Sequence, residues 1–319
     1  MSGASSRLKR YHSWIALAAF ALAAFLVHRA LQEYTWSEVL ASLGQISLGR
    51  LALGVVFTAG SFLCLTGSEA LAVRYTGRAL PYPKIALASF TSLSIGHTLG
   101  FAVFSSGAIR YRFYAGWGLS AGDVGRIIVF CGVTIALGLA TVGGLAAVIR
   151  PDLVGETFGI APSAVVSVGL LLLITVAIYL ALAAFVHRPI RIRNFELPVP
   201  PLRLAVGQIA VATTDLLLVS AVLHQMLSAT SDIDFFPVAA AYVTANTAGI
   251  LSHVPGGLGV IEAVLLSLVP GANVFGALVA FRAIYFLIPF FIGGLVFGVC
   301  EIVRRRHRPG PDSRRSRSS

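Results

Sequence analysis

Four ionisable side chains lie inside long apolar stretches of this sequence. They are Glu69, Asp215, Glu262 and Arg282. Ionisable groups at membrane depth normally face the protein interior and mark ion pairs, substrate paths or proton relays. A carboxylate in such a place can hold a cationic group or carry a proton. The alternative for all four is a structural ion pair between helices, and Glu262 with Arg282 is the pair that the sequence suggests first.

A glycine-rich segment leads up to Glu262 and is the most specific motif of the chain. It reads His253-Val-Pro-Gly-Gly-Leu-Gly-Val-Ile-Glu262. Its glycines, Gly256, Gly257 and Gly259, permit a sharp turn and a close approach of helices. A helix that begins after the turn would direct its N–H groups toward an anion such as a lipid phosphate. A purely structural turn is the alternative, and a dinucleotide fingerprint is excluded because no strand precedes the glycines.

A second polar segment, at 105–112, contains Arg110 and Arg112. Guanidinium groups match phosphate geometry, so these two arginines are candidates for binding a lipid phosphate. The alternative is that they snorkel to the membrane interface and mark topology. His97 and His253 stand at similar places before the two segments, where imidazoles can titrate near neutral pH. Structural, hydrogen-bonded histidines are the alternative there.

The elements that must position these residues are membrane helices. The 319 residues are 57% hydrophobic and 12% charged, with a mean hydropathy of +0.86, whereas soluble domains carry about 25% charged residues. Apolar runs of roughly 20 residues, long enough to cross a bilayer, recur along the chain. This excludes a soluble enzyme and predicts an all-α polytopic integral membrane protein. Six full spans are expected, at Trp14–Ala30, Leu51–Val73, Val124–Ile149, Ala161–Val186, Leu202–Leu227 and Val274–Val303.

Two further uncharged stretches, Ile85–Ile109 and Phe235–Ile261, are rich in Ser, Thr and Gly and are expected to break as helices. The net charge of +11 comes from basic clusters between the apolar runs and in the tail Arg304–Arg317, not from a nucleic-acid-binding face. If both stretches turn back, 20 of the 24 basic residues lie on one side; if both cross, the split is 13 to 10. The positive-inside rule therefore predicts two re-entrant hairpins and two cytoplasmic termini.

The two hairpins give the halves of the chain matching plans of opposite orientation, which is an inverted repeat. We expect one transmembrane domain at 14–303, with repeat A at about 14–150 and repeat B at about 160–303. The N-terminal tail 1–13 and the arginine-rich, disordered tail 304–319 flank it. Inverted repeats with broken helices near the midplane are how many transporters build a site that opens to each face in turn.

Three motifs resemble the membrane portion of the bacterial lysyl-phosphatidylglycerol synthase/flippases, the multiple peptide resistance factors, and their stand-alone relatives. They are Ser106–Arg112 with Tyr114, Pro255–Glu262 and Arg282–Pro289. The resemblance implies two oppositely oriented re-entrant helices and movement of phospholipid between the leaflets of the bacterial inner membrane. The soluble aminoacyl-transferase domain of the two-part relatives has no counterpart here, so no lysyl-transferase enzyme activity is carried over.

We therefore expect a flippase for an anionic or aminoacylated phospholipid, with no cofactor, metal or nucleic acid. A proton-coupled transporter of a small polar solute and a non-catalytic partner of a lipid-modifying enzyme are the alternatives, and a homo-oligomer is possible. The candidate residues for lipid binding or transport are Glu69, His97, Arg110, Arg112, Asp215, His253, Gly256, Gly257, Gly259, Glu262, Arg282 and Tyr285.

Overall fold

The described part of the chain is helical apart from one short strand pair. The structure, a computed structural model, describes residues 41, 43–44, 46–99, 102–186, 190–192, 195–229, 231–252, 265 and 274–306. The helices within these ranges are α3 (Leu48–Tyr75), α4 (Tyr82–Leu99), α5 (Ala102–Gly116), α6 (Ala121–Ile149), α7 (Pro151–Phe158), α8 (Pro162–Phe185), α9 (Leu202–Leu227), α10 (Phe235–Ser252), α12 (Val274–Arg282), the π-helix η2 (Ala283–Leu287) and α13 (Ile288–Arg306). Strands β1 (Ile190–Ile192) and β2 (Phe195–Leu197) pair antiparallel between α8 and α9.

Five helices in the described residues are long and apolar enough to cross a membrane. They are Leu48–Tyr75, Ala121–Ile149, Pro162–Phe185, Leu202–Leu227 and Gly276–Arg304. Each coincides, within a few residues at either end, with a span predicted from the sequence. Large apolar side chains on their outer faces are exposed, as bilayer-facing surface requires. The sixth predicted span, Trp14–Ala30, lies outside the described residues.

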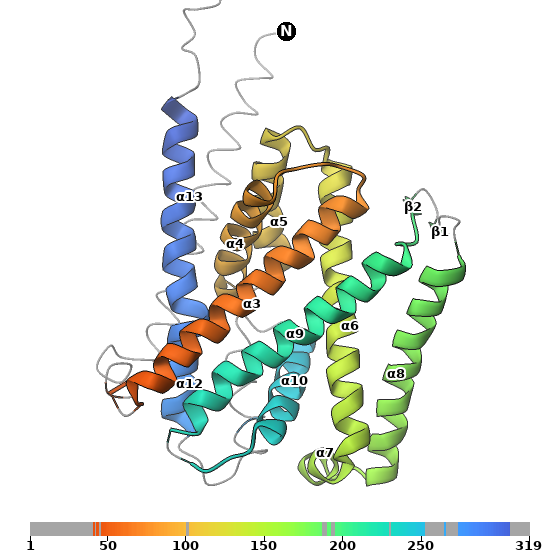
Figure 1. Cartoon of the computed structure of the whole chain (residues 1–319), viewed down its shortest axis with the longest axis vertical. Helices are drawn as coiled ribbons and strands as arrows, with labels where there is room; N and C mark the ends of the chain where they lie inside the picture. The colour runs from red at the N-terminus through yellow and green to blue at the C-terminus, as the bar shows by residue number, and fades with distance from the viewer. Residues whose placement is uncertain are drawn as a thin grey trace, which may run out of the picture.

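Helices α4 and α5 leave and return at the same end of the molecule. In Figure 1 the end of α3, the start of α4, the end of α5 and the start of α6 all lie at the upper end, and α4 and α5 pack against each other. Helix α10 begins at the opposite, lower end. The first path is the one that a hairpin at Ile85–Ile109 requires. The second predicted hairpin, Phe235–Ile261, is described only as far as Ser252.

The loop between α3 and α4 is fixed to the start of α6. Ser120 caps α6 in a capping box with Asp123, which also forms an ion pair with Arg78 at 3.0 Å between Nη2 and Oδ2. Gly77 of the same loop has a φ of 73°, which glycine adopts without strain. These contacts anchor the base of the α4–α5 pair at the upper end of the bundle.

The helix that contains Arg282 and Tyr285 continues through a π-helical segment. The π-helix η2 joins α12 to α13, and Pro289 follows it by two residues. Proline has no N–H to complete the α-helical ladder and its ring crowds the preceding turn, so a wider local helix relieves the conflict. Such segments occur often at functional sites, and this one presents Tyr285 to the interior, where 5% of the residue is exposed.

Candidate functional site

A buried ion pair joins the α4–α5 pair to the first described span. Glu69 of α3 is fully buried, and Arg110 of α5 is 4% exposed. The Arg110 Nε donates to Glu69 Oε1 at 2.8 Å and to Oε2 at 3.0 Å, and Nη2 donates to Oε2 at 2.8 Å. The two charges are therefore removed from solvent together, in the bidentate geometry that compensates best for lost hydration.

Neighbouring side chains complete the hydrogen bonding of this pair. Ser106 accepts a hydrogen bond from Arg110 Nη1 at 2.9 Å, and the Tyr114 hydroxyl donates to Glu69 Oε1 at 3.1 Å. The thiol of Cys131, from α6, lies 3.9 Å from Glu69 Oε2. We call these five residues the Glu69 cluster. Because three helices contribute to it, the cluster can hold α5 against α3 and α6.

Arg110, a predicted phosphate ligand, is held by other side chains in this structure, so a phosphate would have to displace Glu69 to bind it. Its guanidinium is occupied by Glu69 and Ser106, because a charge at this depth needs an opposite charge beside it. For Glu69, the structure supports the alternative of an interhelical ion pair. The pair that the sequence suggested first, Glu262 with Arg282, is not described, since Glu262 lies outside the described residues.

A second polar cluster lies where α3, α9 and η2 meet. The Ser61 hydroxyl donates to Asp215 Oδ1 at 2.5 Å, and Ser61 Oγ is 3.1 Å from the Tyr285 hydroxyl. Ser61 is fully buried, and Tyr285 stacks on Phe281 with ring centroids 5.7 Å apart. We call Ser61, Asp215 and Tyr285 the Asp215 cluster. In the described residues no basic side chain forms an ion pair with Asp215, unlike Glu69.

The Asp215 cluster lies at the middle of the bundle. Ser61 and Asp215 are each the fourteenth residue of their helices, which have 28 and 26 residues. The two helices pack against each other and run in opposite directions in Figure 1. Their midpoints therefore meet at this hydrogen bond, midway along both helices.

The buried face of α4 adds further hydroxyl groups to the interior. Ser89, Thr91, Ser92 and Ser94 are each at most 2% exposed. Helix α13 approaches this face at Gly293, where a Cβ atom would collide with the Ser94 hydroxyl. His97 follows on the same helix and interacts electrostatically with Arg110. The α4 helix thus places a row of polar groups between α3 and α13.

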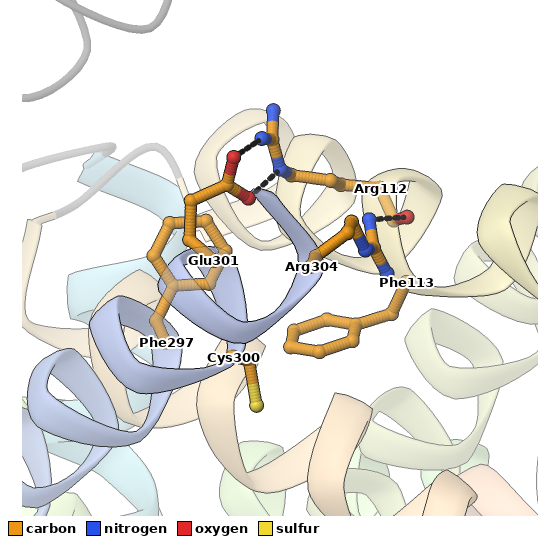
Figure 2. A pocket seen from close by; sticks show the side chains of 6 residues that line it. All are labelled: Arg112, Phe113, Phe297, Cys300, Glu301 and Arg304. Carbon is orange, nitrogen blue, oxygen red and sulfur yellow. Dashed lines mark hydrogen bonds and ion pairs between the residues drawn. The ribbon is translucent and has the colours of Figure 1, made fainter. Parts of the chain in front are cut away.

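At the upper end, Arg112 points to α13 instead of α3. It forms an ion pair with Glu301, with Arg112 Nε 3.0 Å from Oε2, and Arg304 Nη1 donates to the Arg112 carbonyl oxygen at 3.1 Å. Figure 2 shows these groups around a small pocket that Phe113, Phe297 and Cys300 also line. The Arg112 side chain is 42% exposed. It therefore remains accessible to an anionic head group at the surface.

A third buried node links α6, α8 and α9. Gln208 is fully buried; its amide donates to Thr134 Oγ1 at 2.8 Å and to the Phe130 carbonyl at 3.3 Å, and its oxygen accepts from Tyr179. Gln208 and Ser61 are not among the candidate residues predicted from the sequence. An uncharged polar residue inside an apolar run was the available signal, although it does not identify the partner.

Seven of the twelve predicted candidates lie in the described part of the chain, and five lie outside it. Arg282 ends α12, and Tyr285 lies in η2. The candidates outside the described residues are His253, Gly256, Gly257, Gly259 and Glu262. Within the described ranges, no group of three or more His, Cys, Asp or Glu side chains is arranged to hold a metal ion.

Two relatives place the chain in a family. It is 33% identical over 302 residues to the Uncharacterized protein slr0712 of Synechocystis sp., across 92% of this chain and 94% of that protein. It is 25% identical over 283 residues to the Inner membrane protein YbhN of Escherichia coli, across 87% and 88% respectively. The chain therefore belongs to the same family as the Synechocystis protein, and it is homologous to YbhN. No protein-family model matches it.

Family membership agrees with the membrane architecture but is silent on chemistry. YbhN is an inner membrane protein, and the present chain has at least five helices able to span a membrane. Neither relative's name mentions lipid transport. Membership of the multiple peptide resistance factor group, suggested by the three motifs, therefore stays a prediction.

Proposed function

We propose that this protein is a translocase that moves a phospholipid between the leaflets of the bacterial inner membrane. The observation that carries the proposal is the polar interior formed by the Glu69 cluster and the α4 hydroxyls inside a bundle whose outer faces are apolar. Moving a charged head group through hydrocarbon is opposed by a large desolvation cost. A polar path inside the bundle lowers that cost while the acyl chains stay in the bilayer.

The Glu69–Arg110 pair suggests how a head group is held. Opening the pair without a substitute would leave two buried charges uncompensated. A head group with both a phosphate and an ammonium replaces both partners at once, with phosphate on Arg110 and ammonium on Glu69. The proposal therefore favours aminoacylated or zwitterionic phospholipids over purely anionic ones. Arg112, exposed at the upper end, would meet the phosphate first.

The orientation follows from the charges. The upper end of the bundle in Figure 1 carries the α3–α4 loop with Arg78, the end of α5 and the end of α13 with Arg304. The lower end carries the α6–α7 junction with Arg150 beside Asp152. By the positive-inside rule we assign the upper end to the cytoplasm, with α4–α5 as a re-entrant hairpin entered from that side. The proposed activity is transport, with no covalent step.

Reconstitution into liposomes tests the proposal. Purified protein is placed in vesicles that carry a fluorescent phospholipid with an anionic, zwitterionic or lysylated head group, and the label in the outer leaflet is reduced chemically. We expect faster loss of inner-leaflet label than in protein-free vesicles, most strongly for the head groups with an amine. No acceleration for any head group would overturn the proposal, and lipid-independent uptake of a polar solute would support the solute-transporter alternative instead.

A further inference from the structure

The Asp215 cluster has a property that the Glu69 cluster lacks: its carboxyl group has no compensating cation in the described residues. Asp215 accepts from Ser61, and Ser61 contacts Tyr285. An uncompensated carboxylate at the middle of a membrane bundle is costly, and the cost disappears when the group takes up a proton. The two buried carboxyl groups therefore differ in kind, because Glu69 is paired with Arg110, whereas no cation among the described residues is paired with Asp215.

We propose that Asp215 is the proton-carrying group of the transporter and that Ser61 and Tyr285 form its relay. This inference rests on the proposed lipid translocation and gives it an energy source, the transmembrane proton gradient. One proton binds Asp215 from one side of the membrane and leaves to the other side in each transport cycle. No bond other than O–H is made or broken.

The hydrogen-bond directions support a relay. A serine hydroxyl has one O–H to donate, and that of Ser61 goes to Asp215 Oδ1. The Tyr285 hydroxyl must then be the donor in its 3.1 Å contact with Ser61 Oγ. The chain of hydrogen bonds, a proton wire, runs from Tyr285 through Ser61 to the carboxylate. When Asp215 is protonated the same three groups can reverse every bond, and this reversal is what moves a proton from one end of the wire to the other.

The groups around Asp215 leave it as the one that titrates. Cys64 of α3, Tyr242 of α10 and Tyr285 interact with it electrostatically, and all three residue types are mainly neutral at pH 7. On α8, Tyr179 contacts Gln208 instead. From α12, Arg282 precedes Tyr285 by three residues, and the variant Arg282→Gln tests whether its charge matters.

The polar path extends beyond the cluster. Thr58 lies one helical turn before Ser61 and is 7% exposed. Its hydroxyl has no hydrogen-bond partner among the described residues. This buried, unsatisfied hydroxyl lies next to the relay. It would receive the proton after Ser61 on a path toward the Leu48 end of α3. The π-helical segment η2 supplies the movable part, since a shift of its extra residue would rotate Tyr285 away from Ser61.

Proteoliposomes with an imposed pH gradient test the inference. At one proton per lipid, a gradient of one pH unit can sustain up to about a tenfold ratio of labelled lipid between leaflets. We expect the wild-type protein to build up such a ratio. When lipid is added outside, a pH-sensitive dye in the vesicle lumen should report a fall in lumenal pH. Asp215→Asn should lose both responses, and Ser61→Ala should slow both. The matched control is Asp152→Asn, at an exposed carboxylate on α7, which should behave as the wild type.

Each outcome separates the inference from the proposed function. If the wild-type protein moves no lipid, the proposed function itself fails. If it moves lipid with no response to the pH gradient, or if Asp215→Asn still couples, the inference alone is overturned. Should Asp215→Asn not fold, the dye measurement on Ser61→Ala and Asp215→Glu decides. Loss of coupling in Arg282→Gln with full coupling in Asp215→Asn would move the proton site to the surroundings of Arg282 and also overturn the inference.

Discussion

Removing one partner of the Glu69–Arg110 pair should destabilise the protein far more than removing both. Both side chains are at most 5% exposed, and three contacts of 2.8 to 3.0 Å join them. Glu69→Gln leaves a buried guanidinium without its counter-charge, and Arg110→Met leaves a buried carboxylate. Breaking a buried pair in this way costs about 3–5 kcal/mol. The double variant Glu69→Gln/Arg110→Met has no buried charge, and its new amide oxygen can still accept a hydrogen bond from Tyr114.

Losses of unfolding free energy of this size are measurable by thermal unfolding of detergent-solubilised protein. At roughly 2 °C or more per kcal/mol, each single variant should lower the unfolding midpoint by about 6 °C or more. The double variant should recover most of this loss, so that the coupling free energy exceeds about 2 kcal/mol. Single variants that each cost less than about 1 kcal/mol, or losses that simply add in the double variant, would refute the claim that the pair is desolvated and mutually compensating.

Three further stability changes follow from single contacts, each read by the same unfolding assay. Arg112→Gln should cost at most about 1 kcal/mol, because its ion pair with Glu301 is partly exposed; a larger loss would mean that this contact is buried. Gln208→Leu should cost about 1–3 kcal/mol, since buried partners on α6 and α8 lose their hydrogen bonds. An unchanged stability would contradict the claim that Gln208 links these helices. Gly138→Ala should cost about 1–3 kcal/mol, because its Cβ would come within 2.7 Å of a neighbouring side chain on α9. The control Gly132→Ala, with open space at its Cβ, should be stable, and equal losses in the two variants would disprove the close packing.

The spans could be predicted from the sequence because each is a long apolar run. Helices α3, α6, α8 and α9 lie within a few residues of the expected ranges. The Ser-, Thr- and Gly-rich stretch at Ile85–Ile109 is predicted to turn back, and α4 begins and α5 ends at the same end of the bundle in Figure 1. Membrane depth, the re-entrant character of the hairpins, the repeat boundaries and the cytoplasmic termini remain predictions.

The partners of the buried charges could not be predicted, because they depend on which helix faces meet. Arg110 and Arg112 belong to the same motif, and the sequence predicts the same role, phosphate binding, for both. Two residues apart on a helix, however, they point about 200° apart. Arg110 therefore meets Glu69 on α3, whereas Arg112 meets Glu301 on α13. Sequence separations of 41 and 189 residues carry no local signal of either contact.

Ser61 shows the same limit for uncharged residues. A serine within an apolar run is common in membrane helices, where its hydroxyl can bond to the preceding turn. Nothing local distinguishes Ser61 from such residues. Its role emerges only when the midpoints of α3 and α9 are brought together and Asp215 is found opposite. Asp215 itself was recognisable because a carboxyl group in an apolar run is rare.

If the Glu69–Arg110 pair is the place where a lipid head group is held, removing both charges should abolish lipid movement without unfolding the protein. The double variant Glu69→Gln/Arg110→Met is expected to be folded but unable to hold a charged head group. Reconstituted beside the wild type at equal protein content, it should leave inner-leaflet labelled phospholipid as protected as in protein-free vesicles. Wild-type rates of lipid movement in the folded double variant would show that the head group is held elsewhere.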